Sequence, residues 1–135
     1  MRLVVTVGSD GDPHALGPLP PNVHVGQFIP QSDLLPHCDL VVSHGGSGTF
    51  LATLAHGVPQ LVLPQGADQF INASALEASG AGLALLSDDI TVACIRDCAQ
   101  RLLLSPDYRQ QAARVADESL AMPSAEEVVM RLERL

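Results

Sequence analysis

One segment of the sequence, residues 40–64, constrains the fold more than any other. It reads LVVS, then HGGSGT, then a stretch of helix-forming residues, and finally QLVLP. Two apolar runs that are joined through one helix pair in parallel, because the helix carries the chain back to the end where the first strand began. Such crossover connections are almost always right-handed. The segment therefore predicts a β-α-β unit within a parallel sheet.

Short apolar runs alternate with helical stretches on both sides of this segment. Runs at Leu3–Val7 and Val23–Val25 precede it, and a weaker run, GLALL, follows at residues 82–86. Together with the first segment they predict about five strands. The expected fold class is α/β, a three-layer domain with a mainly parallel sheet and a helical C-terminal segment. No linker interrupts the pattern, so residues 1–135 are expected to form a single domain.

Capping residues and glycines indicate where the helices begin and end. A helix is expected from about Ser47 to His56, and Asp68 is expected to cap a second helix that runs through about Ser79. The segment PQSDLLPHC predicts a short helix with Ser32 or Asp33 as its cap. After residue 90 the periodicity is wholly helical.

Positive charge is scarce in this chain, which limits its partners. The sequence has a formal net charge of -8 and no lysine, and the next arginine after Arg2 is Arg96. Nucleic-acid binding needs a basic surface to neutralise phosphates, so this class of function is excluded. A single small anion is still compatible, because a helix N-terminus offers N–H groups and a favourable dipole without side-chain charge.

The sequence gives no sign of a membrane segment or a metal site. No apolar run approaches the roughly 20 residues that span a bilayer, and the start of the chain becomes polar too early for a signal peptide. Cys38, Cys94 and Cys98 lack the spacing of a zinc site, as do the histidines. A cytoplasmic protein with reduced thiols, no metal and no cofactor is expected.

The run GGSG, residues 45–48, allows two interpretations. Its small residues let the backbone turn tightly, and Ser47, Gly48 and Thr49 then present backbone N–H groups at the first turn of a helix. This geometry suits a phosphate, and His44 is the one nearby side chain that could add a donor or a partial charge. Alternatively, the small residues only let the helix pack closely on the sheet, and the glycines alone favour neither interpretation.

Two common nucleotide-binding motifs do not fit the sequence. A P-loop requires a lysine, which the chain lacks. A dinucleotide fingerprint requires G-x-G-x-x-G, and GGSGTF breaks this pattern at the last glycine. Asp68 does lie twenty residues after Gly48, where a ribose-binding acid would stand, but it also stands where a helix begins. NAD binding is therefore only a weak alternative.

Four motifs occur in a fixed order along the chain: FIPQ at 28–31, HGGSGT at 44–49, GVPQLVLP at 57–64 and ADQ at 67–69. Together they resemble the nucleotide-sugar-binding signature of family 1 glycosyltransferases, above all the bacterial branch that decorates macrolides, enediynes and other polyketides. The resemblance covers residues 3–122. It implies half of a GT-B fold, a Rossmann-like C-terminal domain that binds the nucleotide diphosphate sugar. A separate N-terminal domain would bind the acceptor and supply the catalytic base.

The resemblance implies a diphosphate site at the glycine run. His44 and the backbone N–H groups of Gly46, Ser47, Gly48 and Thr49 would hold the diphosphate. The site would act as an electrostatic clamp, which positions the donor and stabilises charge on the departing diphosphate. No residue of this chain is assigned a catalytic role.

The resemblance also assigns the nucleoside and the sugar. Phe28 would lie against the base, with the Ile29 backbone and Gln31 near the base or the ribose. Asp68 and Gln69 would hydrogen-bond hydroxyl groups of the sugar. Each assignment has a plainer alternative: Phe28 could be a core residue, Asp68 a helix cap and Gln69 an ordinary first-turn residue.

The chain departs from the family pattern in two ways. Many relatives carry a glutamate three residues after the last phosphate-binding position, where it binds the ribose hydroxyls; this chain has Ala52 there. A dTDP-sugar, with its 2′-deoxyribose, is therefore favoured over a UDP-sugar. Secondly, the first βα unit of the domain is expected to be missing, together with the acceptor domain and its catalytic base.

The sequence is compatible with three functions. It does not decide between them, and so it does not decide whether the chain is an enzyme. The first is a donor-binding domain that is inactive by itself. The second is a catalytic subunit that a separate acceptor-binding partner completes. The third is a degenerate, non-enzymatic association domain, in which an unpaired sheet edge would favour a homodimer.

Overall fold

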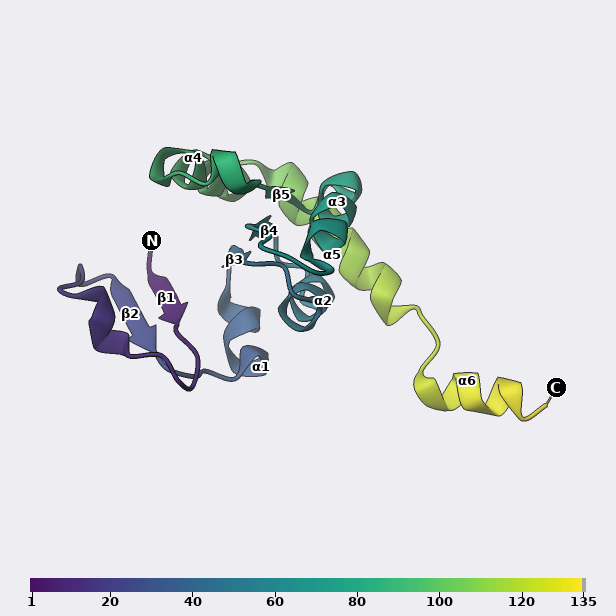
Figure 1. Ribbon diagram of the computed structural model, residues 1–135. Helices are drawn as coiled ribbons and strands as arrows, with labels where there is room; N and C mark the ends of the chain where they lie inside the picture. The colour runs from purple at the N-terminus through teal and green to yellow at the C-terminus, as the bar shows by residue number, and fades with distance from the viewer. Residues whose placement is uncertain (135) are drawn as a thin grey trace. The chain divides into compact units, whose positions relative to one another are not determined.

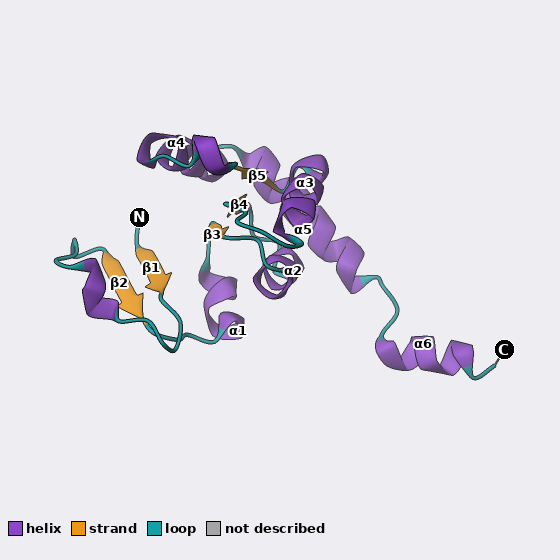
Figure 2. Cartoon of the chain, in the orientation of Figure 1, coloured by secondary structure: helices purple, strands orange, loops and turns teal. Residues whose placement is uncertain are grey.

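The computed structural model describes residues 1–134, and the chain divides into two compact units, Met1–His37 and Cys38–Leu135. Five strands are described, and every strand pair is parallel (Figures 1 and 2). The predicted α/β class with parallel strands is therefore confirmed. The strands form a two-stranded and a three-stranded sheet rather than one. The expectation of a single domain stays a prediction.

The first unit is built on one parallel strand pair. Its elements are β1 (Leu3–Thr6), a 3-10 turn (Pro13–Leu16), β2 (Val23–Gly26), α1 (Gln31–Leu34) and a second 3-10 turn (Leu35–His37). The predicted cap of the short helix is wrong. Pro30 occupies the N-cap position of α1, and Ser32 and Asp33 lie inside the helix, where the Ser32 hydroxyl donates to the Asp33 carboxylate over 3.3 Å.

The second unit contains a three-stranded sheet in the order β3-β4-β5. Its elements are β3 (Val41–Ser43), α2 (Ser47–Ala55), β4 (Gln60–Val62), α3 (Gln69–Ser79), β5 (Gly82–Ala84), a 3-10 turn (Ser87–Asp89), α4 (Val92–Leu104), α5 (Pro106–Leu120) and α6 (Ala125–Leu132). The predicted β-α-β unit of residues 40–64 is confirmed as β3, α2 and β4. Because Val41, Gln60 and Gly82 are in register, the carboxyl ends of β3 and β4 lie next to each other.

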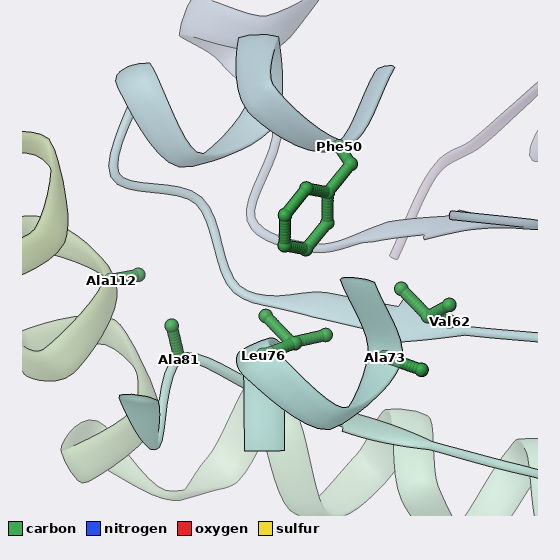
Figure 3. Close-up of a cluster of buried hydrophobic side chains, with 6 residues drawn as sticks. All are labelled: Phe50, Val62, Ala73, Leu76, Ala81 and Ala112. Atoms are coloured by element: carbon green, nitrogen blue, oxygen red, sulfur yellow. The ribbon is translucent and has the colours of Figure 1, made fainter. Parts of the chain in front are cut away.

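The core of the second unit lies between its helices and the middle strand. Strand β4 is buried along its whole length, and α2 and α3 both contact α5. The buried cluster consists of Phe50, Val62, Ala73, Leu76, Ala81 and Ala112 (Figure 3). The Phe50 ring points from α2 toward Leu76 of α3 in this view. This packing fixes the first turns of α2 and α3 relative to the ends of β3 and β4.

Gln60 joins the sheet to α2 through a buried hydrogen bond. Its side-chain Nε2 donates to the backbone carbonyl of Phe50 over 3.1 Å, and the residue is 0% exposed. The bond places the start of α2 over the middle strand. Within residues 1–134, no helix combines the length and the apolar character that a membrane span requires.

Candidate functional site

The turn between β3 and α2 is fixed by its own residues. Gly45 has a φ of 81°, a conformation that L-residues rarely adopt. Its N–H donates to the Ser43 hydroxyl over 3.1 Å. A Cβ at this position would lie 2.4 Å from Cγ1 of Val62, so β4 leaves no room for a side chain. The first glycine of the run is therefore required by both backbone conformation and space.

His44 lies beside the N-terminus of α2. Its ring is so close to Gly46 that a Cβ on this glycine would lie 2.6 Å from the imidazole Nε2. Gly46 is the N-cap residue of α2 and offers no side-chain cap. The structure therefore brings one imidazole and the first N–H groups of a nine-residue helix to the same place. This combination of hydrogen-bond donors suits an anion.

The Asp68 carboxylate joins the turn between β3 and α2 (residues 44–47, called the glycine turn below) to α3, since it accepts hydrogen bonds from Ser47 and, over 3.5 Å, from Asn72. It occupies the N-cap position of α3, as predicted, but its side chain makes no capping hydrogen bond. Its ψ of -10° is helical, whereas a capping residue is typically extended. The Ser47 hydroxyl instead donates to the Asp68 carboxylate. The predicted capping role of Asp68 is therefore wrong, and the carboxylate links the first turns of α2 and α3.

The surroundings of Asp68 keep its carboxylate ionised. The hydrogen bond from Ser47 is the main cause that lowers the pKa of Asp68 below its ordinary value, against a smaller desolvation effect. The amide of Asn72 and the nearby His44 lower the pKa further. The contribution of this carboxylate to stability is therefore present above its unfolded-state pKa and is lost as the pH falls through the lowered, folded-state pKa.

Ser47→Ala is expected to raise the pKa of Asp68 toward its ordinary value, because it removes the strongest hydrogen bond to the charged form. An NMR titration of the Asp68 side-chain carboxyl carbon measures this shift. Ser74→Ala serves as the control. It changes an exposed residue of α3, the helix that begins after Asp68, and should leave the titration of Asp68 unchanged. An unchanged pKa in Ser47→Ala would show that the hydroxyl does not bind the carboxylate in solution.

Gln69 holds the loop that precedes α3. Its side-chain Oε1 accepts hydrogen bonds from the backbone N–H of Gln65 over 2.8 Å and of Gly66 over 3.1 Å. The side chain is therefore more than an ordinary first-turn residue. It folds back over its own loop and fixes the approach of the chain from β4 to Asp68.

Asn72 is the site residue that the sequence analysis missed. Its Nδ2 donates to the Gly45 carbonyl oxygen over 2.8 Å, and it lies 3.4 Å from the Ser47 hydroxyl oxygen. The helical spacing could have indicated it, because a residue four positions after Asp68 lies on the same face of a helix. Its contact with the glycine turn could not be derived from spacing alone.

The three predicted nucleoside-binding residues belong to the first unit. Phe28 is 74% exposed, which does not fit the alternative core role. Ile29 packs against Gly26, where a Cβ would lie 3.4 Å from the Ile29 Cδ1. Gln31 is the first residue of α1. The structure thus gathers the predicted diphosphate and sugar residues in the second unit, and the nucleoside assignments stay predictions.

The assembled site can hold an oxygen-rich anion through backbone N–H groups and one imidazole. It combines the N-terminus of α2, the His44 imidazole and one carboxylate, and no lysine or arginine occurs between residues 3 and 95. The described part of the chain, residues 1–134, has no group of three His, Cys, Asp or Glu side chains that could hold a metal ion. The backbone N–H groups and the imidazole can bind and orient such an anion by hydrogen bonds.

Comparison with known proteins identifies close likenesses along the whole chain. The family model for the C-terminal domain of erythromycin biosynthesis protein CIII-like proteins matches residues 2–135. The chain is 44% identical over 119 residues to an aclacinomycin-T 2-deoxy-L-fucose transferase of Streptomyces galilaeus, covering 87% of this chain and 27% of the relative. It is 46% identical over 117 residues to the elloramycin glycosyltransferase ElmGT of Streptomyces olivaceus, covering 87% and 29%.

Solved structures agree with these relatives. A glycotransferase of kitacinnamycin has a TM-score of 0.89 at 31% identity, covering 98% of this chain and 34% of its own. The glycosyltransferase VinC, solved in complex with dTDP, has a TM-score of 0.87 at 30% identity, covering 98% and 41%. The chain spans less than a third of the length of the curated relatives described above.

Proposed function

Because the chain belongs to the family of erythromycin biosynthesis protein CIII-like C-terminal domains, we propose that it binds the nucleotide diphosphate sugar of an antibiotic glycosyltransferase. The observation that carries the proposal is the glycine turn, where the His44 imidazole meets the N-terminus of α2. The relatives support it, since they are glycosyltransferases of antibiotic biosynthesis and one similar structure contains dTDP. The fold corresponds to the C-terminal half of a GT-B glycosyltransferase.

The diphosphate is held at the start of α2. The N–H groups of Gly46, Ser47, Gly48 and Thr49 donate to its oxygens, and His44 adds a side-chain donor. The dipole of α2 favours negative charge at this end, so the binding needs no lysine or arginine. The same donors stabilise the charge that develops on the diphosphate as the sugar departs, which is where hydrogen bonds accelerate such a transfer most.

The remaining parts of the donor are assigned to two further sets of residues. Asp68 and Gln69, at the start of α3, hydrogen-bond hydroxyl groups of the sugar. Phe28, the Ile29 backbone and Gln31 contact the base and the ribose. A small-molecule natural product is the acceptor, and a separate acceptor-binding domain or subunit supplies the catalytic base. The isolated chain therefore binds the donor but does not transfer the sugar.

The nucleotide is dTDP rather than UDP. Ala52 lies on α2, one turn after Gly48, and its methyl group cannot hydrogen-bond the ribose hydroxyls. A 2′-deoxyribose loses less from the absence of a polar side chain at this position than a ribose does. Tighter binding of UDP than of dTDP would contradict this part of the proposal.

Calorimetric titration of the chain with dTDP, UDP and NAD tests the proposed function. Saturable binding of dTDP is expected, and His44→Ala should weaken it by about tenfold or more, because it removes a hydrogen bond to a charged group. His56→Ala is the matched control, since His56 lies at the opposite end of the same helix. Absence of dTDP binding by the unmodified chain would overturn the proposal, as would equal effects of the two histidine variants.

A further inference from the structure

The side chain of Asn72, on α3, binds the glycine turn at the peptide group that carries the N–H of Gly46. Its Nδ2 donates to the carbonyl oxygen of Gly45 over 2.8 Å. This carbonyl and the N–H of Gly46 belong to the same peptide group. In a trans peptide the two point in opposite directions, and the group is planar. A hydrogen bond that fixes the Gly45 carbonyl therefore also fixes the direction of the Gly46 N–H.

We propose that Asn72 is a positioning residue, which orients the Gly45–Gly46 peptide so that its N–H, and not its carbonyl, faces the diphosphate. This inference rests on the proposed function, because it concerns the same site. Rotation of the peptide by half a turn would present carbonyl lone pairs to the phosphate oxygens and would repel them. The amide of Asn72 opposes this rotation because it binds the carbonyl on the side of α3.

The two glycines make such a restraint necessary. A peptide between two glycines can rotate at low cost, because neither residue has a Cβ that excludes the alternative conformations. The preceding peptide is already fixed, since the Gly45 N–H donates to the Ser43 hydroxyl over 3.1 Å. Asn72 fixes the next one. Two side chains, from β3 and α3, thus restrain two consecutive peptide groups of the turn.

The position of Asn72 suits this role. It lies in the first turns of α3, and its backbone N–H bonds the Asp68 carbonyl over 3.0 Å as part of the helix. The side chain is half-buried, next to Ala73 of the core. The restraint on the turn is therefore anchored in a packed helix and does not depend on a bound ligand.

Two variants of Asn72 test the proposal by calorimetric titration with dTDP. Asn72→Ala removes the donor, and Asn72→Leu removes it while keeping a side chain that branches at Cγ. Both are expected to weaken dTDP binding by about three- to tenfold, which corresponds to the loss of one hydrogen bond. Ser74→Ala, an exposed change two residues along the same helix, should leave the affinity unchanged. Recovery of full affinity in Asn72→Leu would assign Asn72 a packing role and overturn the proposal.

An NMR measurement on the unmodified chain tests the same point without any substitution. The amide proton of Gly46 should shift strongly on addition of dTDP, and the shift should shrink in Asn72→Ala. A Gly46 amide that does not respond to dTDP in the unmodified chain would overturn the positioning role. Failure of the unmodified chain to bind dTDP at all would instead overturn the proposed function, and this inference with it.

Discussion

Gly45→Ala is expected to lower the free energy of unfolding by about 2–5 kcal/mol and to abolish measurable dTDP binding. Two costs add at this position. A φ of 81° disfavours any residue with a Cβ, and the new methyl group would lie 2.4 Å from the Cγ1 of buried Val62. Relief of the overlap would move the turn away from β4 and displace the N–H groups at the start of α2. Urea unfolding and titration with dTDP measure the two effects separately.

Gly48→Ala is the matched control for this experiment. It changes another glycine of the same run, but a Cβ there meets no atom within 4 Å, and its φ is not positive. Since alanine is the better helix former, stability should be unchanged or slightly raised. Equal stability of Gly45→Ala and Gly48→Ala would show that the turn is not constrained as the structure describes it. Combination of Gly45→Ala with Val62→Ala should remove the overlap but not the strain in φ.

Leu76→Ala is expected to lower the free energy of unfolding by about 2–5 kcal/mol, the range for a buried leucine whose removal leaves a cavity. Leu76 is 1% exposed and belongs to the cluster with Phe50 and Val62. A loss of this size is a large part of the stability of a small domain, so the melting temperature should fall by about 10 °C. Thermal unfolding followed by circular dichroism measures the change.

Ile71→Ala provides the comparison for the core substitution. Ile71 lies on the same helix, α3, and is 73% exposed, so its truncation removes little buried surface. Its melting temperature should stay within a few degrees of that of the unmodified chain. If Leu76→Ala and Ile71→Ala had the same melting temperature, the contacts of α3 with the sheet would have to differ from those described.

The sequence predicted the order of the elements well because strand and helix periodicities are local properties. Residues 40–64 form the expected strand, helix and strand, and α2 and α3 end beside Gly57 and Gly80, as these glycines predict. The number of sheets was not predictable in the same way. Pairing between strands depends on contacts between distant segments, and no local pattern assigns β2 and β3 to separate sheets.

The site was predicted only in part, because a sequence pattern reveals neighbours along the chain but not contacts between distant segments. The glycine run and His44 stand next to each other in the sequence, so their proximity at the start of α2 could be anticipated. Asp68 was expected to cap its own helix, whereas it accepts a hydrogen bond from Ser47, which is 21 residues away. Asn72 was missed because its partner, Gly45, lies 27 residues away and has no side chain that a motif could reveal.

The fold-back of Gln69 limits what this side chain can recognise. Because its carbonyl oxygen is already bound by two backbone N–H groups of the loop, only its two amide protons remain for a ligand. The side-chain amide cannot exchange the positions of its oxygen and nitrogen without breaking both bonds. It can therefore donate a hydrogen bond to a ligand but cannot accept one. A substituent with lone pairs satisfies these protons, whereas an ammonium group or a bare methylene leaves them unpaired. In the proposed sugar site, the loop that follows β4 would thus determine which oxygenation pattern of a sugar the first turn of α3 accepts.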